Sequence, residues 1–166
     1  MRTKAGQKGF TLVEVMVVVA IIGILAAVAT PMIMASLPRY RLRAAVRELV
    51  IDFKKAKIEA VKRNRDVLLV FTLETVGNAD AGGSYQICVD NNNNDLCEAS
   101  EIIKDVNMPP RVRLEGTTFT TPDHWAGYTS RGLPWESNWG TVSLKTIDGA
   151  RSYQISMSSA GGVHLQ

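Results

Sequence analysis

The feature that most constrains this chain is a long apolar run near its start. Residues 10–29 read FTLVEVMVVVAIIGILAAVA, in which Glu14 is the only charged residue. An α-helix rises about 1.5 Å per residue, so roughly twenty residues cross the hydrocarbon of a bilayer. The run therefore predicts a membrane-spanning helix, which we place at residues 10–31.

The residues before the run are basic. Residues 1–9, MRTKAGQKG, carry Arg2, Lys4 and Lys8 and no acid, like the first region of a signal peptide. An ordinary signal has its small-residue cleavage site after the apolar run, whereas here the small residue, Gly9, precedes it. Cleavage after Gly9 would leave the apolar helix on the mature protein.

The junction KGFTLVE at residues 8–14 resembles the class III signal of type IV pilins and type II secretion pseudopilins. The resemblance implies that residues 1–9 are a leader, that a prepilin peptidase cuts after Gly9, and that the new terminal residue, Phe10, is N-methylated. It also implies an assembly role for the carboxylate of Glu14 and a helix kink at Pro31.

The energetic cost of placing a carboxylate in a membrane also singles out Glu14, independently of the family resemblance. A carboxylate inside a spanning helix costs roughly 2.5 to 3.5 kcal/mol on insertion scales, so it marks a function. In pilin-like assemblies its partner is the amine of the mature terminus, on its own or a neighbouring subunit. The alternative is that Glu14, close to the end of the span, reaches headgroup water.

The sequence after Pro31 stays helical but becomes amphipathic. Apolar residues recur at helical spacing between lysines and arginines, at Leu42, Val46, Leu49, Phe53, Ala56 and Ala60. We therefore expect one helix over residues 11–64, kinked near Pro31 and at Pro38, whose second half, residues 32–65, packs on a sheet.

The remainder, residues 66–166, reads as a β-rich head. Strands are expected at residues 67–72, 85–89, 111–115, 117–120, 141–146, 152–157 and 163–165, with a hairpin turn at Asp148-Gly149 and a turn cluster at residues 79–84. A long kinked helix followed by short antiparallel strands is an α+β arrangement, and the resemblance implies the pilin-like form of it. The aromatic segment 117–138 either covers the sheet or forms a contact surface, and Trp139 is expected in the core.

Within the pilin-like proteins, the chain is most similar to the GspH, FimT and FimU group of minor pseudopilins and minor pilins. The likeness lies at residues 55–63, in the strand at Val67, and at residues 140–144 and 153–165. It implies a subunit present in few copies that primes assembly or sits near a filament tip. The implied partners are other pilin or pseudopilin subunits, prepilin peptidase and an inner-membrane assembly platform. The implied location is the bacterial inner membrane, crossed once with the head in the periplasm, and then a type IV pilus or a type II secretion pseudopilus.

Charge is distributed unevenly. The net charge is +3, and removing the leader leaves equal numbers of basic and acidic residues. Residues 39–65 hold ten basic and three acidic residues, whereas residues 66–166 hold six basic and twelve acidic ones. The basic stem suits an acidic neighbouring head or anionic lipid, or is a solvated helix face.

Some FimT-like proteins bind DNA through basic residues around their last glycine turn, so a DNA-receptor pilin is the main alternative function. Here that turn, residues 158–164, contains no lysine or arginine. Phosphate neutralisation by such cations supplies most DNA affinity, so we do not expect nucleic-acid binding.

Cys88 and Cys97 lie in the part of the chain that the family exports. In an oxidising compartment such a pair forms a disulfide, and one closing this short loop would stabilise the head by about 2 to 3 kcal/mol.

The loop between the cysteines resembles a calcium-binding loop. Asp90, Asn92, Asn94 and Glu101 occupy its first, third, fifth and twelfth positions, and Leu96 offers a carbonyl at the seventh. The sixth position is Asp95 instead of glycine, and no flanking helices are expected. The alternatives are a calcium-stabilised head and a polar turn whose asparagines bind their own backbone.

No enzyme is expected, and no cofactor beyond that possible calcium ion. The chain has no nucleophile elbow and no phosphate-binding glycine loop, and His124 and His164 lie far apart in the sequence.

Overall fold

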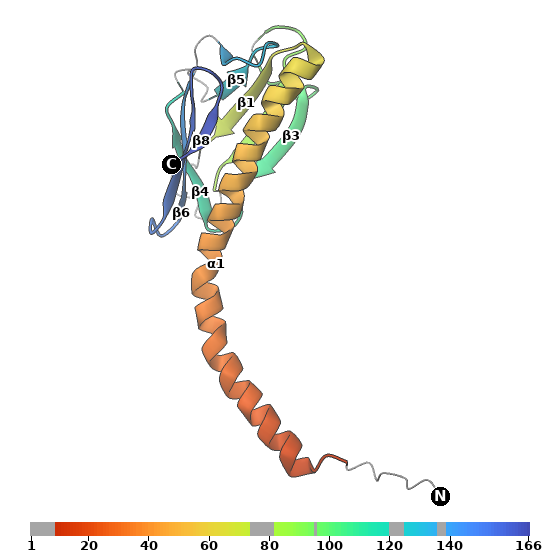
Figure 1. Cartoon of the computed structure of the whole chain (residues 1–166), viewed down its shortest axis with the longest axis vertical. Helices are drawn as coiled ribbons and strands as arrows, with labels where there is room; N and C mark the ends of the chain where they lie inside the picture. Colours follow the sequence, from red (N-terminus) through yellow and green to blue (C-terminus); the bar gives the residue numbers. More distant parts are fainter. Residues whose placement is uncertain (1–8, 74–81, 95, 120–124, 136–138) are drawn as a thin grey trace, which may run out of the picture. The chain divides into compact units, whose positions relative to one another are not determined.

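The computed structural model describes residues 9–73, 82–94, 96–119, 125–135 and 139–166. These contain one long helix, α1 (Leu12–Arg63), and eight strands: β1 (Val67–Thr72), β2 (Ser84–Val89), β3 (Ile102–Asn107), β4 (Val112–Thr117), β5 (Trp125–Tyr128), β6 (Gly140–Thr146), β7 (Ser152–Met157) and β8 (Val163–Leu165) (Figure 1). The chain divides into two compact units, residues 1–37 and residues 38–166, and α1 contributes to both.

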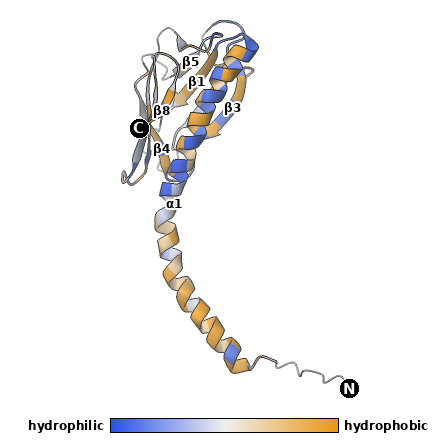
Figure 2. Ribbon diagram, viewed as in Figure 1, coloured by the Kyte–Doolittle hydropathy of each residue, from blue (hydrophilic) through white to orange (hydrophobic). Residues whose placement is uncertain are grey.

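The first unit is the apolar part of α1. Every side chain from Leu12 to Ala35 is exposed, and Figure 2 shows this part of the helix coloured almost entirely as hydrophobic. The helix continues through Pro31, although proline has no N–H to donate to the preceding turn. The kink expected near Pro31 stays a prediction.

The second unit contains the rest of α1, which is amphipathic as expected. The apolar side chains on one face are buried, namely Leu42, Ala45, Val46, Leu49, Phe53, Ala56 and Ala60. They pack against the sheets: the ring of Phe53 lies 6.1 Å from Phe71 on β1 and 6.5 Å from Phe119 after β4, centroid to centroid. This face of α1 therefore forms the base of the core.

The strands of the second unit form two antiparallel sheets. One has the order β3-β2-β1-β5 and the other β4-β6-β7-β8. Alternate residues of the central strands face the core, as in β6, where Val142, Leu144 and Thr146 are buried. The buried core cluster lies wholly between Leu42 and Met157, so the second unit has a hydrophobic core of its own.

Most expected strands are confirmed, and the differences are local. The Asp148-Gly149 hairpin joins β6 to β7, with Gly149 at a φ of 69°. The prediction of a separate strand at residues 117–120 is wrong. Thr117 ends β4, and Thr118 and Phe119 lie outside any strand; residue 120 lies outside the described residues. The turn cluster predicted at residues 79–84 falls partly on residues 79–81, which also lie outside the described residues.

Three features were not expected. Strand β3 lies in a stretch that we did not predict as a strand, and β5 lies inside the segment expected to be irregular. The placement of Trp139 in the core is wrong, because 58% of this residue is exposed.

Candidate functional site

The start of α1 holds Glu14 in the first helical turn. The backbone N–H of Glu14 donates to the Thr11 side-chain hydroxyl at 3.2 Å, and Val15 N–H donates to the Thr11 carbonyl, also at 3.2 Å. Thr11 is therefore the N-cap, and the Thr-x-x-Glu spacing is that of a capping box. The positive end of the helix dipole favours a carboxylate at this position.

Gly9 and Phe10, the predicted cleavage and methylation residues, precede this cap. Both are exposed, and Phe10 is 83% exposed. A side chain added at Gly9 would meet no atom within 4 Å. Gly9 and Phe10 are therefore not packed against other described residues.

No other described residues cover the apolar part of α1. The helix contains an 18-residue window with a mean hydropathy of 2.9 and none of it buried, long and apolar enough to cross a membrane. Soluble proteins rarely expose a contiguous apolar surface of this size. These side chains need lipid or other helices around them.

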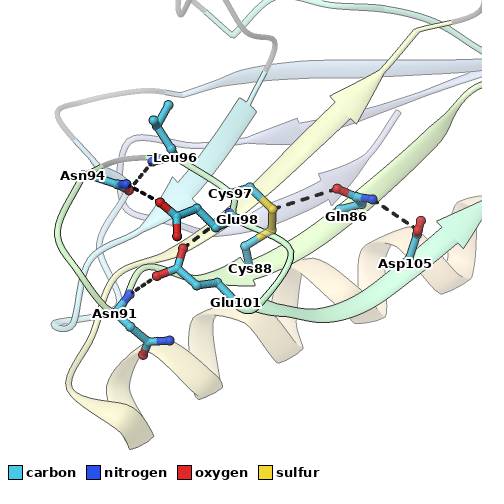
Figure 3. The surroundings of a disulfide bond; sticks show 9 residues. All are labelled: Gln86, Cys88, Asn91, Asn94, Leu96, Cys97, Glu98, Glu101 and Asp105. Atoms are coloured by element: carbon cyan, nitrogen blue, oxygen red, sulfur yellow. Dashed lines mark hydrogen bonds between the residues drawn. A yellow bond between two sulfur atoms is a disulfide. The ribbon is translucent and has the colours of Figure 1, made fainter.

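The expected disulfide is confirmed. Cys88, fully buried on β2, is bonded to Cys97, and their Cα atoms are 5.6 Å apart. Figure 3 shows the bridge at the base of the loop between β2 and β3. It closes this loop against the sheet.

The five residues predicted to bind calcium all lie in or beside this loop. Three of them, Asp90, Asn92 and Asn94, accept backbone hydrogen bonds through side-chain oxygens. Asn94 N–H donates to Asp90 Oδ1 at 3.2 Å and to Asn92 Oδ1 at 3.1 Å, and Leu96 N–H donates to Asn94 Oδ1 at 3.0 Å. Hydrogen bonds to a residue two or four positions away are the pattern of asparagine-rich turns.

Glu101 closes the same loop from its far end. Its two carboxylate oxygens accept from Asn91 N–H at 2.9 Å and Glu98 N–H at 3.4 Å, and the residue is 5% exposed (Figure 3). Among the described residues, which omit Asp95, no three acidic, cysteine or histidine side chains are grouped to hold a metal. The donor set thus has the chemistry that calcium needs, but its oxygens are turned to the loop's own amides.

A buried polar cluster that we did not predict joins α1 to the first sheet. Tyr85 Oη on β2 donates to Asp52 Oδ2 at 2.5 Å, and Lys104 Nζ on β3 lies 2.6 Å from Asp52 Oδ2 and 2.9 Å from Glu48 Oε1. Asp52 is 2% exposed. The available signal was the position of Asp52, a carboxylate on the helix face that carries the core.

These contacts shift the protonation equilibria of the cluster. Burial raises the pKa of Tyr85 strongly, and the hydrogen bond and charge of Asp52 add to the effect. Burial alone would lower the pKa of Lys104, but its contacts with Asp52 and Glu48 outweigh this and raise it. The cluster thus consists of a neutral tyrosine and a lysine in contact with two carboxylates, and it links α1 to the first sheet.

The last glycine turn, Ser158–His164, is less free of cations than its sequence suggests. Lys57 Nζ on α1 donates to the Gly161 carbonyl at 3.4 Å, and Tyr128 Oη donates to the same oxygen at 3.4 Å. Gly161 has a φ of 73°, which suits glycine. The turn thus contacts one lysine, which is held in place by the fold.

The described part of the aromatic segment joins the first sheet as β5 and continues to Trp135, which packs on Trp125. The Trp125 and Trp135 rings lie 5.0 Å apart, Trp125 is 6% exposed, and Trp135 Nε1–H donates to Asp66 Oδ2 at 3.0 Å. This agrees with the covering alternative for these two residues; residues 120–124 and 136–138 lie outside the described part.

Two family models match the chain. The prokaryotic N-terminal methylation motif matches residues 4–30, and the model of type II transport protein GspH matches residues 45–161. The chain belongs to the GspH family. It is therefore a pilin-like structural subunit, of a class that assembles with other pilin subunits.

Curated relatives of this GspH-family chain are pilins. Over 165 residues it is 27% identical to the pilin-like protein PilA1 of Thermus thermophilus, covering 96% of this chain and 99% of the relative. It is 35% identical over 102 residues to a fimbrial protein of Pseudomonas aeruginosa, covering 55% of this chain and 65% of that protein.

Two solved structures have the same fold. The type IV minor pilin FimU of Pseudomonas aeruginosa superposes with a TM-score of 0.55 at 18% identity, covering 77% of this chain and 90% of FimU. The minor pseudopilin EpsH of the Vibrio cholerae type 2 secretion system superposes with a TM-score of 0.50 at 10% identity, covering 76% of this chain and 96% of EpsH. These two likenesses show that the GspH-family chain has a pilin-like fold.

Proposed function

We propose that this GspH-family chain is a minor pilin or minor pseudopilin, cut after Gly9 by a prepilin peptidase and N-methylated at Phe10. It is then held in the bacterial inner membrane by residues 10–31, with its head in the periplasm, and passes into a filament through the same helix. Its action is structural: it primes assembly or occupies a position near the tip. The methylation motif over residues 4–30 supports the processing steps.

The observation that carries this proposal is the uncovered apolar part of α1. Its side chains are exposed along the whole stretch from Leu12 to Ala35. Lipid can cover them before assembly and a bundle of equivalent helices can cover them afterwards, so one surface serves both states. A single carboxylate, Glu14, lies at the start of this surface and would pair with a terminal amine, fixing the axial position of the subunit.

Two alternatives remain as hypotheses. For a DNA-receptor pilin, the contact of Lys57 with the last glycine turn adds a cation, but Lys57 is partly buried and already bound to the Gly161 carbonyl. For a calcium-stabilised head, the loop oxygens accept hydrogen bonds from backbone amides instead. Neither is favoured over the assembly role.

The processing steps are tested by intact mass of the full chain, purified from membranes of cells with and without a prepilin peptidase. We expect loss of residues 1–9 and gain of one methyl group only when the peptidase is present. The matched control is Gly9→Leu, whose added side chain meets open space, so it should fold and remain uncut. An uncut leader on the unsubstituted chain in the presence of the peptidase would contradict the proposal.

A further inference from the structure

Arginines gather where α1 enters the second unit. Arg39, Arg43 and Arg47 follow one another at intervals of four along α1, which places them on one face of the helix. Arg151 comes from the hairpin before β7, and all four residues are exposed. They form a cluster that we call the arginine groove.

Tyr153 on β7 lies in the centre of the arginine groove. Arg43 Nε–H donates to Tyr153 Oη at 3.4 Å. A hollow of about 210 Å³ is lined by Arg43, Arg47 and Tyr153, with Val46 and Leu165 as its apolar walls. A smaller hollow beside it is lined by Arg39, Leu42, Arg43, Arg151 and Tyr153. The groove therefore combines several guanidinium groups with apolar walls.

No acidic residue in the described part of the chain neutralises the positive charge of the groove. Within the described residues, none of the four arginines forms an ion pair. A hydrogen bond from Arg43 lowers the pKa of the Tyr153 hydroxyl, and the charges of Arg43, Arg151 and Arg47 lower it further. Nearby Glu48 is paired with Lys104. The groove is thus positive and open.

We propose that the arginine groove binds the phosphate of an anionic phospholipid headgroup while the subunit is held in the membrane. Guanidinium groups bind phosphate oxygens through paired N–H donors, and Val46 and Leu165 suit the less polar part of a headgroup. The inference rests on the membrane insertion proposed above, and it is independent of the later entry into a filament.

The arginine groove follows the predicted span closely in the sequence. The span ends at Pro31, and Arg39 comes eight residues later. Eight residues of chain reach at most roughly 28 Å, so Arg39 stays within that distance of the end of the span. Polybasic segments just outside a span bind anionic lipid surfaces.

Three described carboxylates of the head already have partners within their own subunit. Glu115 is paired with Lys145, Glu98 accepts hydrogen bonds from Asn92 and Asn94, and Glu101 is buried in its own loop. A lipid phosphate fits the charge of the groove, and the filament arm of the test below separates it from a carboxylate of a second copy.

The test is native mass spectrometry of the full chain in detergent with added phosphatidylglycerol or phosphatidylcholine of identical acyl chains. We expect the unsubstituted chain to retain phosphatidylglycerol preferentially, and the triple variant Arg39→Gln, Arg43→Gln, Arg47→Gln to lose roughly tenfold of that retention. The matched control Lys54→Gln, Lys55→Gln, Lys62→Gln removes the same charge from exposed positions of the same helix and should retain the lipid. If the triple variant fails to fold, Arg47→Gln with Arg151→Gln keeps the Arg43–Tyr153 contact and should show a smaller loss.

Three results would overturn the inference. One is equal retention of both lipids by the unsubstituted chain. Another is equal loss in the groove variant and the lysine control, which would indicate net charge alone. The third is a groove variant that retains phosphatidylglycerol fully but is absent from filaments that the lysine control enters, which would make the groove a subunit interface. If Glu14→Ala left filament entry unchanged, that result would contradict the proposed function and would leave this lipid site unaffected.

Discussion

The hydroxyl of Tyr85 donates a 2.5 Å hydrogen bond to the carboxylate of Asp52, and both residues are buried. Tyr85 belongs to the first sheet and Asp52 to α1, so the bond joins the helix to the sheet. Lys104 binds the same carboxylate oxygen at 2.6 Å. Within the second unit, α1 is thus held to the first sheet by a polar contact as well as by apolar packing.

We expect Tyr85→Phe to lower the free energy of unfolding by about 1 to 2 kcal/mol, because Asp52 loses one donor and keeps Lys104. Asp52→Ala should cost more, about 2 to 4 kcal/mol, because it leaves Tyr85 and Lys104 without their acceptor. Urea unfolding of the full chain in detergent, followed by near-ultraviolet circular dichroism, measures both. Tyr40→Phe, at a residue 67% exposed, is the control. A Tyr85→Phe variant as stable as this control would show that the Tyr85–Asp52 hydrogen bond does not stabilise the fold.

Alkaline pH should destabilise the second unit through Tyr85. Burial and Asp52 raise its folded-state pKa far above the ordinary value of 10.0, and burial raises that of Tyr128 to about 12. The folded state therefore holds protons that the unfolded state releases above pH 10, so this stability is complete below pH 10 and falls as the pH rises beyond it. The raised pKa of Lys104 acts in the same direction at higher pH.

The slope that each buried tyrosine contributes is about 1.4 kcal/mol per pH unit. Thermal unfolding of the full chain between pH 8 and pH 11, roughly spanning the ordinary tyrosine and lysine values, measures it. Tyr85→Phe should show a shallower decline than the unsubstituted chain. Identical declines in the two proteins would show that Tyr85 is not the group responsible.

Calcium should leave the head unchanged if the loop oxygens stay bound to backbone amides. We expect calcium and a chelator to give the same melting temperature for the full chain, because Asp90, Asn94 and Glu101 already accept N–H groups of the loop. Isothermal titration with calcium gives a second reading. A calcium-dependent stabilisation that Glu101→Gln abolishes would instead establish the metal site.

Sequence periodicity was sufficient to predict the helix and the main strands. The apolar spacing from Leu42 to Ala60 predicted which face of α1 is buried, and the β-branched run at Val67–Thr72 predicted β1 at its observed bounds. These signals are local, so a single sequence carries them.

The missed features depend on tertiary context. Strand β3 contains Lys104 and Asp105 and lies at a sheet edge, so it lacks the apolar alternation of a central strand. Strand β5 contains the small residues Ala126 and Gly127, whose burial comes from pairing with β1. The arginine groove needs side chains from α1, β7 and β8, which no sequence spacing brings together.

The loop between the cysteines shows how one pattern supports two structures. Oxygen donors at alternate positions fit calcium ligation and also fit turns closed by asparagine side chains. The sequence contains no information on which group the oxygens face. In the structure, Asn94 Oδ1 faces the Leu96 amide, which local backbone conformation decides.

The most direct test of the account is the amount of a Glu14→Ala variant in purified filaments or tip complexes, relative to its amount in the inner membrane. The control, Glu98→Ala, removes an exposed carboxylate from the head instead. We predict that both variants reach the membrane and that the control enters the filament fraction normally. Glu14→Ala should be depleted from that fraction about tenfold or more, because it removes the carboxylate that would pair with a terminal amine away from water. Incorporation of Glu14→Ala at the level of the control would contradict the account.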